Sequence, residues 1–124
     1  MTPEGKQDKG WGYELVWASN EKYCGKILVF ERPGAKTPMQ FHKTKECSLF
    51  VNGGQFALRF IDTKTAELKQ QNIKEGDTYK VNPMQPYQLI SMTPNSIIFE
   101  VGTSDDPDDI YVVGPGDSMP KTEG

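Results

Sequence analysis

The 124-residue chain is long enough to form one domain around a single core. It carries 14 Lys and Arg against 17 Asp and Glu, for a formal net charge of −3. The two signs are mixed along the chain, so no basic stripe is present to displace counterions from phosphates. This excludes an electrostatic case for nucleic-acid binding. No run approaches the roughly 20 apolar residues that a membrane span requires.

The two ends of the chain are polar and contain several glycines and prolines. Residues 1–10 lack the apolar stretch of a secretory signal and are predicted to be a flexible lead-in. Residues 114–124 are predicted to be a flexible tail that follows a short apolar island. Without a secretory route, Cys24 and Cys47 are expected to be reduced thiols, and the protein is expected to be cytoplasmic.

Between the ends, the sequence predicts short strands separated by turns. The segment 63–71 is the one place where a helix competes, and a strand is favoured because its apolar residues mark no helical stripe. Turns every eight to twelve residues or so indicate a sandwich or a closed barrel, and a barrel is favoured because it removes exposed strand edges. The predicted strands are residues 13–18, 23–32, 48–52, 55–61, 67–73, 78–81, 87–92, 96–101 and 110–113.

Some of these strands carry a clear facial pattern or a turn signal. In residues 55–61, Phe56, Leu58 and Phe60 fall on one face at period two, which is typical of a half-buried strand. Gly53-Gly54 before it predicts a hairpin with the preceding strand. A second hairpin is predicted between the strands 87–92 and 96–101.

The most informative segment runs from Gly34 to Gly53. It reads Gly34, five residues, Gln40-Phe41-His42, three residues, Glu46, six residues and Gly53. This spacing resembles the first sequence motif of the cupin superfamily, which has glycine, His-x-His, glutamate and glycine at these positions. Gln40 stands where the family has its first histidine.

A second cupin motif is matched in part. Gly76 and Pro83 approximate its glycine and proline, and Tyr87 stands where the family has its last histidine. The openings Trp11–Glu14 and Lys22–Leu28 are similar to those of sugar-related cupins, including the type II mannose-6-phosphate isomerase group.

The closing residues 98–101 and 105–110 are similar to that group as well. The resemblance runs from about residue 11 to residue 113. It implies an all-β cupin double-stranded β-helix, a jelly-roll barrel, over residues 11–113. It also implies homodimerisation.

In metal-binding cupins the four motif positions are metal ligands, which here implies Gln40, His42, Glu46 and Tyr87. His42 is the only histidine in the chain. With so few nitrogen donors the set suits Mn²⁺, Mg²⁺ or Ca²⁺ better than Fe²⁺ or Zn²⁺. Whether a divalent metal is bound stays open at this point, and Cys47 is expected to face away from the site.

The resemblance implies a cavity that binds a sugar or a sugar phosphate, with an isomerase or epimerase reaction. With a metal, the ion polarises a carbonyl while Glu46 or His42 moves the proton. Without one, His42 acts as general base and Tyr87 as general acid. The alternative is a catalytically silent barrel that binds a ligand or a partner protein.

Each candidate residue also has a purely structural interpretation. Glu46 would pair with Lys43 or Lys45 at the surface, Tyr87 would be ordinary core, and Gln40 would only line the barrel. The lysines at positions 36, 43 and 45 are interpreted as a solvated face. In the catalytic interpretation, Lys36, Lys43 or Arg59 would meet a substrate phosphate.

Overall fold

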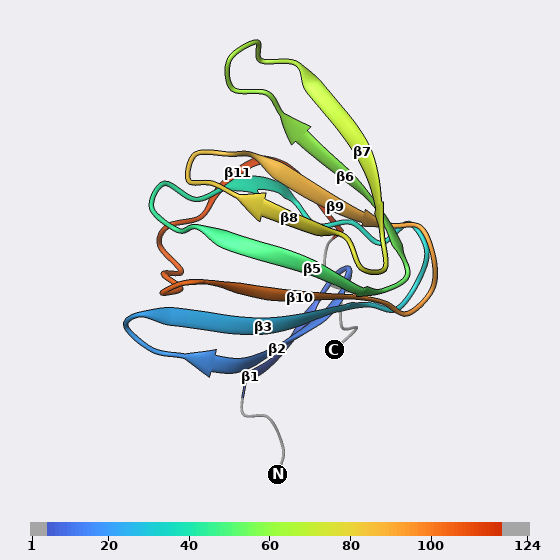
Figure 1. Ribbon diagram of the computed structural model, residues 1–124, viewed down its shortest axis with the longest axis horizontal. Helices are drawn as coiled ribbons and strands as arrows, with labels where there is room; N and C mark the ends of the chain where they lie inside the picture. Colours follow the sequence, from blue (N-terminus) through green and yellow to red (C-terminus); the bar gives the residue numbers. More distant parts are fainter. Residues whose placement is uncertain (1–4, 118–124) are drawn as a thin grey trace, which may run out of the picture.

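The computed structural model describes residues 5–117. These residues form two antiparallel β-sheets that face each other, which confirms the expected all-β jelly roll (Figure 1). No helix among them is long and apolar enough to cross a membrane. Residues 1–4 and 118–124, parts of the predicted flexible ends, lie outside the described residues.

One sheet has six strands in the order β1-β2-β3-β10-β5-β8, and the other has five in the order β11-β4-β9-β6-β7. The strands are β1 (Gly5–Lys9), β2 (Gly12–Ser19), β3 (Tyr23–Phe30), β4 (Met39–Phe41), β5 (Cys47–Gly53), β6 (Gln55–Ile61), β7 (Leu68–Lys74), β8 (Thr78–Val81), β9 (Tyr87–Ser91), β10 (Ser96–Thr103) and β11 (Tyr111–Gly114).

The order of the strands corrects two predicted hairpins. β5 and β6 do not pair, because β5 belongs to the six-stranded sheet and β6 to the five-stranded sheet. β9 and β10 are separated in the same way. At the first crossing Gly54 has a φ of +80°, a conformation that glycine adopts without steric cost. These turns carry the chain from one sheet to the other, which lets the apolar faces of consecutive strands pack against each other.

β2 and β3 form an antiparallel hairpin. The side chain of Asn20 accepts hydrogen bonds from the backbone N–H groups of Lys22 and Tyr23, at 2.8 and 3.1 Å. The strand prediction for the ambiguous segment is also confirmed, because β7 covers its second half and pairs along its whole length with β6.

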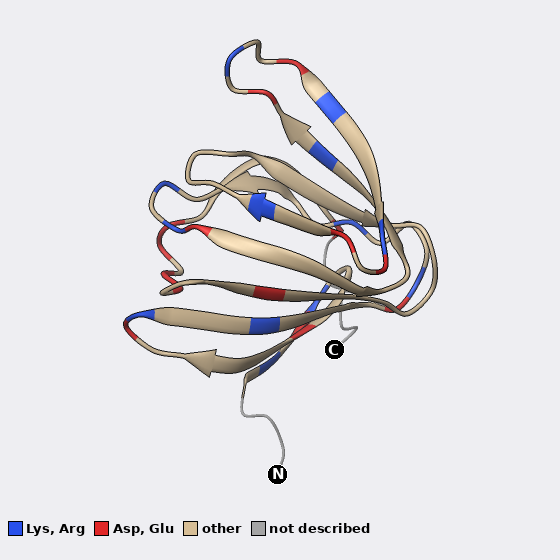
Figure 2. Ribbon diagram, in the orientation of Figure 1, with Lys and Arg blue, Asp and Glu red and all other residues tan. Residues whose placement is uncertain are grey.

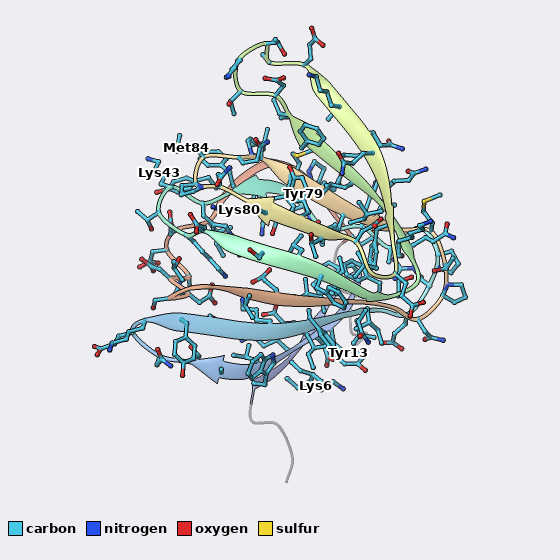
Figure 3. All side chains as sticks on the ribbon, in the orientation of Figure 1. Lys6, Tyr13, Lys43, Tyr79, Lys80 and Met84 are labelled. Atoms are coloured by element: carbon cyan, nitrogen blue, oxygen red, sulfur yellow. The ribbon has the colours of Figure 1, made fainter. Side chains whose placement is uncertain are left out.

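The N-terminal residues 5–9 differ from the predicted flexible lead-in. They form β1, which pairs with β2 in register from Gly5 with Val16 to Lys9 with Gly12. The Nζ of Lys6 lies 4.8 Å from the ring centroid of Tyr13, and Figure 3 places these two side chains together. The segment is polar and lacks an apolar face, so its strand is stabilised by pairing to an existing edge, which sequence patterning does not reveal.

The core is built around aromatic rings. Phe30 is fully buried, stacks on Trp11 with centroids 4.5 Å apart, and meets Phe56 edge-on at 4.9 Å. The predicted facial pattern of β6 is confirmed, since Phe56 and Leu58 are fully buried and Phe60 packs against the core. Tyr79 of β8 points toward the five-stranded sheet, 6.3 Å from Phe60 between ring centroids (Figure 3).

Acidic and basic positions are spread over both sheets and most connecting loops, and no face is dominated by one sign (Figure 2). This agrees with the mixed charge of the sequence. Cys24 and Cys47 are both buried and unpaired, as expected for reduced thiols.

Candidate active site

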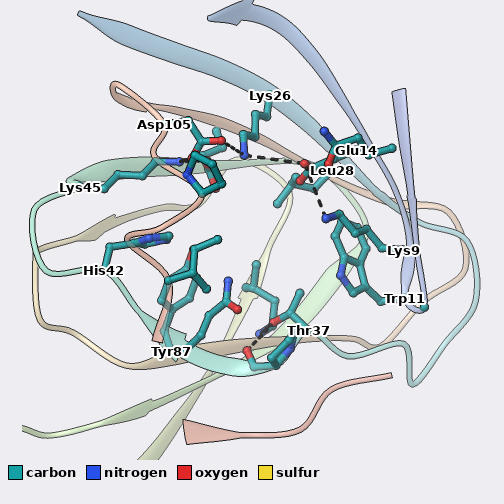
Figure 4. A pocket seen from close by; sticks show the side chains of 18 of the residues that line it. Lys9, Trp11, Glu14, Lys26, Leu28, Thr37, His42, Lys45, Tyr87 and Asp105 are labelled. Carbon is teal, nitrogen blue, oxygen red and sulfur yellow. Dashed lines mark hydrogen bonds and ion pairs between the residues drawn. The ribbon is translucent and has the colours of Figure 1, made fainter. Parts of the chain in front are cut away.

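A cavity of about 420 Å³ lies inside the barrel between the two sheets (Figure 4). Residues of both sheets line it, as do residues of the segment between β10 and β11. Three of the four sequence-predicted site residues are among them, namely Gln40, His42 and Tyr87. Gln40 of β4 and Tyr87 of β9 are Cα partners across the five-stranded sheet. The alternation of a strand places His42 on the same side as Gln40.

The fourth predicted residue, Glu46, does not lie with the others. Its side chain is 49% exposed, and its carboxylate is 3.8 Å from the Nζ of Lys80 on the outer surface. The inward positions are instead those of Lys45 and Cys47, which alternate with Glu46 along the chain. The expectation that Cys47 faces away is therefore wrong, and so is the interpretation of Lys45 as part of a solvated face.

His42 is held by a single contact to the backbone. Its Nδ1 lies 2.6 Å from the carbonyl oxygen of Asp109. A carbonyl oxygen only accepts hydrogen bonds, so Nδ1 carries the proton in neutral His42 and Nε2 keeps a free lone pair. Figure 4 shows the imidazole ring directed into the cavity.

The side chain of Asp109 fixes the turn that follows His42. Its carboxylate accepts hydrogen bonds from the backbone N–H groups of Lys43, Thr44 and Lys45 and from the Thr44 hydroxyl, at 2.7–3.2 Å. The Thr44 hydroxyl and these N–H groups hold the pKa of Asp109 well below its usual value. One residue thus positions both the imidazole and the turn that carries Lys45 into the barrel.

A network of charged side chains occupies the cavity wall formed by the six-stranded sheet. The Nζ of Lys45 lies 3.2 Å from Glu100 and 2.9 Å from Asp105. The Nζ of Lys26 lies 3.0 Å from Asp105 and 3.8 Å from Glu14. Burial disfavours both ammonium groups, but the carboxylates outweigh this and raise the pKa of each lysine. Both lysines are therefore charged at neutral pH.

Tyr87 lies on the opposite wall next to Cys47. Burial raises the pKa of Tyr87 well above its usual value, and nearby Cys47 and Glu100 raise it further. Burial also raises the pKa of the Cys47 thiol to about 12. Both groups are protonated at neutral pH, so Tyr87 has an O–H to donate.

The sequence analysis did not identify the buried charged residues. Lys26 and Glu100 stand at mid-strand positions two residues from buried Leu28 and Ile98, on the same strand faces. Strand periodicity was therefore an available signal. Asp105 carried no such signal, because it lies in an irregular segment.

The three residues expected to meet a phosphate do not line this cavity. Lys36 and Arg59 line a separate hollow near β11. The Nζ of Lys43 lies over the ring of Tyr111, at 4.6 Å from its centroid. The cations that face the cavity are instead Lys26, Lys45 and Lys9.

The residues around His42 do not fit a divalent metal. Glu46 faces outward, which leaves one imidazole nitrogen, one amide oxygen and a protonated phenol. The carboxylates inside the cavity are each paired with a lysine, which competes with a cation for their oxygens. Among residues 5–117 no three His, Cys, Asp or Glu side chains converge on a point that could hold an ion.

Comparison with known proteins identifies the fold. No family model matches the sequence, and no curated protein matches it either. Solved structures do match. The capsular polysaccharide assembling protein CapF from Staphylococcus aureus superimposes with a TM-score of 0.77 at 13% identity, over 92% of this chain and 33% of that one.

Oxalate decarboxylase from Bacillus subtilis gives a TM-score of 0.76 at 15% identity, over 90% of this chain and 30% of that one. KdgF from Halomonas sp. gives 0.70 at 15% identity, over 85% of this chain and 90% of that one. The chain therefore spans about a third of the length of CapF and oxalate decarboxylase.

These similarities, together with the two packed sheets, show the fold of the chain. The chain has the cupin fold, a double-stranded β-helix, as its sequence motif predicted.

Proposed function

We propose that the cavity binds a small polyhydroxylated molecule, a sugar or sugar derivative, and that His42 and Tyr87 transfer protons on it without a metal. The observation that carries the proposal is the 2.6 Å contact between Nδ1 of His42 and the Asp109 carbonyl oxygen. In neutral His42 this contact leaves Nε2 with its lone pair and directed at the ligand space, which is the arrangement that a general base requires.

The proposed reaction is an isomerisation or epimerisation next to a carbonyl group. Nε2 of His42 removes the proton from the carbon beside the carbonyl, and the carbonyl oxygen takes a proton from the O–H of Tyr87. Return of the proton to the former carbonyl carbon gives the isomer. Return of the proton to the opposite face of the same carbon gives the epimer. Burial keeps Tyr87 protonated, and the paired charges around the cavity offer hydrogen bonds to ligand hydroxyls.

The test is proton exchange with solvent. We expect the protein to catalyse deuterium incorporation beside the carbonyl of a keto sugar, with D-fructose and D-fructose 6-phosphate in D₂O as the probes and proton NMR as the measurement. H42N keeps an N–H for the Asp109 carbonyl but lacks the Nε2 lone pair. It should slow the exchange about 10²–10⁴-fold, the usual contribution of a general base.

The matched control is K43Q, which alters the exposed neighbour of His42 and should exchange at the wild-type rate. Exchange by H42N at the wild-type rate would reject the role of His42. Binding of the sugars by calorimetry without any exchange would favour the second candidate function, the catalytically silent barrel. The observation that supports a barrel used only for binding is an exposed apolar face on the same molecule.

That face is the outer side of the six-stranded sheet, where we propose that a second copy of the chain docks. Trp17, Phe50, Phe99 and Val101 are 60, 41, 39 and 52% exposed on it. Phe50 and Phe99 are Cα partners with ring centroids 6.4 Å apart. The ring of Trp17 lies so close to Gly25 that a Cβ there would meet it. The four central strands β2, β3, β5 and β10 have at most one charged position each (Figure 2), and those residues, Glu14, Lys26 and Glu100, line the cavity on the other side of the sheet.

The area of this face matches the requirement of a dimer. Aromatic side chains bury about 150–250 Å² each, so the exposed parts of these four side chains sum to on the order of 400 Å² per copy. With the partly exposed Leu15 and Ile27 beside them, two copies would bury about 1,000 Å², the lower bound of a specific interface.

We expect light scattering after gel filtration to give about twice the 13.9 kDa mass of the chain at 100 µM or so. F99K should give the monomer mass because it places a charge in the centre of the apolar face. V112K, at an exposed position of β11, is the control and should remain dimeric. A wild-type monomer at that concentration would reject the dimer.

A further inference from the structure

One carboxylate bridges the two buried lysines of the cavity. Oδ1 of Asp105 lies 2.9 Å from the Nζ of Lys45, and Oδ2 lies 3.0 Å from the Nζ of Lys26. The two lysine side chains are only 4 and 11% exposed, whereas that of Asp105 is 30% exposed. Figure 4 shows Asp105 between the two lysines at the wall of the cavity.

Lys26 is part of the six-stranded sheet, whereas Asp105 is not. Lys26 lies in β3, and Lys45 lies two residues before β5, so they flank β10 and its residue Glu100. Asp105 belongs to the irregular segment between β10 and β11. Each lysine also has a carboxylate from the sheet, Glu14 at 3.8 Å and Glu100 at 3.2 Å.

The charges inside the cavity show what a replacement for Asp105 must carry. Asp117, which also lines the cavity, is paired with Arg32 at 2.7 Å. Among the remaining charged residues, Lys9, Lys26 and Lys45 balance Glu14, Glu100 and Asp105. Without Asp105 the cavity holds one net positive charge, and each lysine has an ammonium hydrogen directed at the vacated position. A buried charge without a partner is costly, so an incoming group with one negative charge would be stabilised there.

We propose that Lys26 and Lys45 form a carboxylate-binding subsite, and that Asp105 occupies it as an internal substitute until the carboxylate of a ligand displaces it. The inference rests on the proposed function, because it assigns an acid group to the small molecule that the cavity binds. The ligand class is then a sugar acid or another hydroxy acid rather than a neutral sugar.

The anchoring of the neighbouring segment is compatible with such an exchange. Asp109, four residues further on, makes its own hydrogen bonds to the turn 43–45, and none of them involves Asp105. The segment can therefore release Asp105 while Asp109 continues to hold the His42 side of the cavity. Both lysines are anchored independently of Asp105, because Lys26 lies in β3, which is paired on both sides, and the backbone N–H of Lys45 donates to the Asp109 carboxylate.

The subsite is tested with acetate, which has the same carboxylate and no other functional group. D105A should lower the midpoint of thermal unfolding, and sodium acetate should restore it in a saturable manner, with sodium chloride at equal ionic strength as the reference. The acetate dissociation constant of D105A should be at least about tenfold lower than that of the wild type, because a tethered Asp105 competes at an effective concentration in the millimolar range.

Two further variants give the controls. D105A/K26M removes one of the two lysines and should lose the rescue by acetate. D108A, at an exposed position of the same segment, should respond to acetate as the wild type does. If D105A does not fold, D105N is titrated in its place, with nitrogen-15 NMR shifts of the backbone amides as the readout.

Equal responses of D105A and the wild type to acetate would overturn the proposal. A stronger rescue by inorganic phosphate than by acetate would overturn the carboxylate assignment. The readout is stability and does not involve His42. Rescue without proton exchange would therefore retain the subsite and reject the chemistry of His42, and exchange without rescue would reject the subsite alone.

Discussion

Replacing Phe30 by alanine should lower the free energy of unfolding by about 3–5 kcal/mol, the usual cost of deleting a buried aromatic side chain. Phe30 is fully buried and contacts both Trp11 and Phe56, so its removal leaves a cavity at the point where the two sheets meet. Domains of this size have a total stability of about 5–15 kcal/mol, so the loss would remove a large part of it.

Urea unfolding followed by tryptophan fluorescence measures this effect, because Trp11 stacks on Phe30. F41A is the matched control, since Phe41 is only partly buried and stacks on Tyr111 near the surface. Its loss should be no more than about 1.5 kcal/mol, the range of one aromatic pair. A loss in F30A no greater than that in F41A would contradict the assignment of Phe30 to the centre of the core.

Replacing Lys45 by methionine should cost about 3 kcal/mol of unfolding free energy. Removing one partner of a buried ion pair typically costs 3–5 kcal/mol, and the lower end applies because water partly screens Asp105. Methionine has nearly the length of lysine and keeps the packing, so the loss reports the charge. K45M leaves the buried carboxylate of Glu100 without its 3.2 Å partner.

The companion variants make this prediction specific. E100Q should cost less than K45M, about 1 kcal/mol, because Lys45 keeps its 2.9 Å contact to Asp105. The double variant K45M/E100Q should be more stable than K45M, because the unpaired carboxylate is gone. Chemical denaturation at pH 7 measures all three. A K45M protein within 0.5 kcal/mol or so of the wild type would mean that the pair is solvated and not part of the barrel interior.

The sequence alone was sufficient for the fold class and for three residues that line one cavity, namely Gln40, His42 and Tyr87. Period-two alternation in β6 identified its buried face, and the spacing around His42 identified the cupin motif. Both are local patterns, in which a residue's neighbours along the chain determine which way its side chain points. The same locality explains why Gln40 and His42 were correctly placed on one side of their strand.

What the motif could not decide was the orientation of the residues after the turn. Counting from His42 pointed to Glu46, but the turn held by Asp109 directs Lys45 and Cys47 inward and leaves Glu46 outside. The hydrogen bonds responsible join residues more than sixty positions apart. No pattern within the segment 40–53 contains that information, and a shift of one residue exchanges the two faces of a strand.

The pairing of strands was likewise decided by the tertiary structure. Short turns such as those after β5 and before β10 are typical of hairpins. Both turns nevertheless carry the chain between sheets, because packing one apolar face on another buries more surface than a local hairpin does. β1 forms because its backbone can pair with the free edge of strand β2. The charged cavity was also decided by the tertiary structure. Lys26, Lys45, Glu100 and Asp105 are ordinary surface residue types in the sequence, and they become a site because the fold brings opposite charges from distant strands together where little water can screen them.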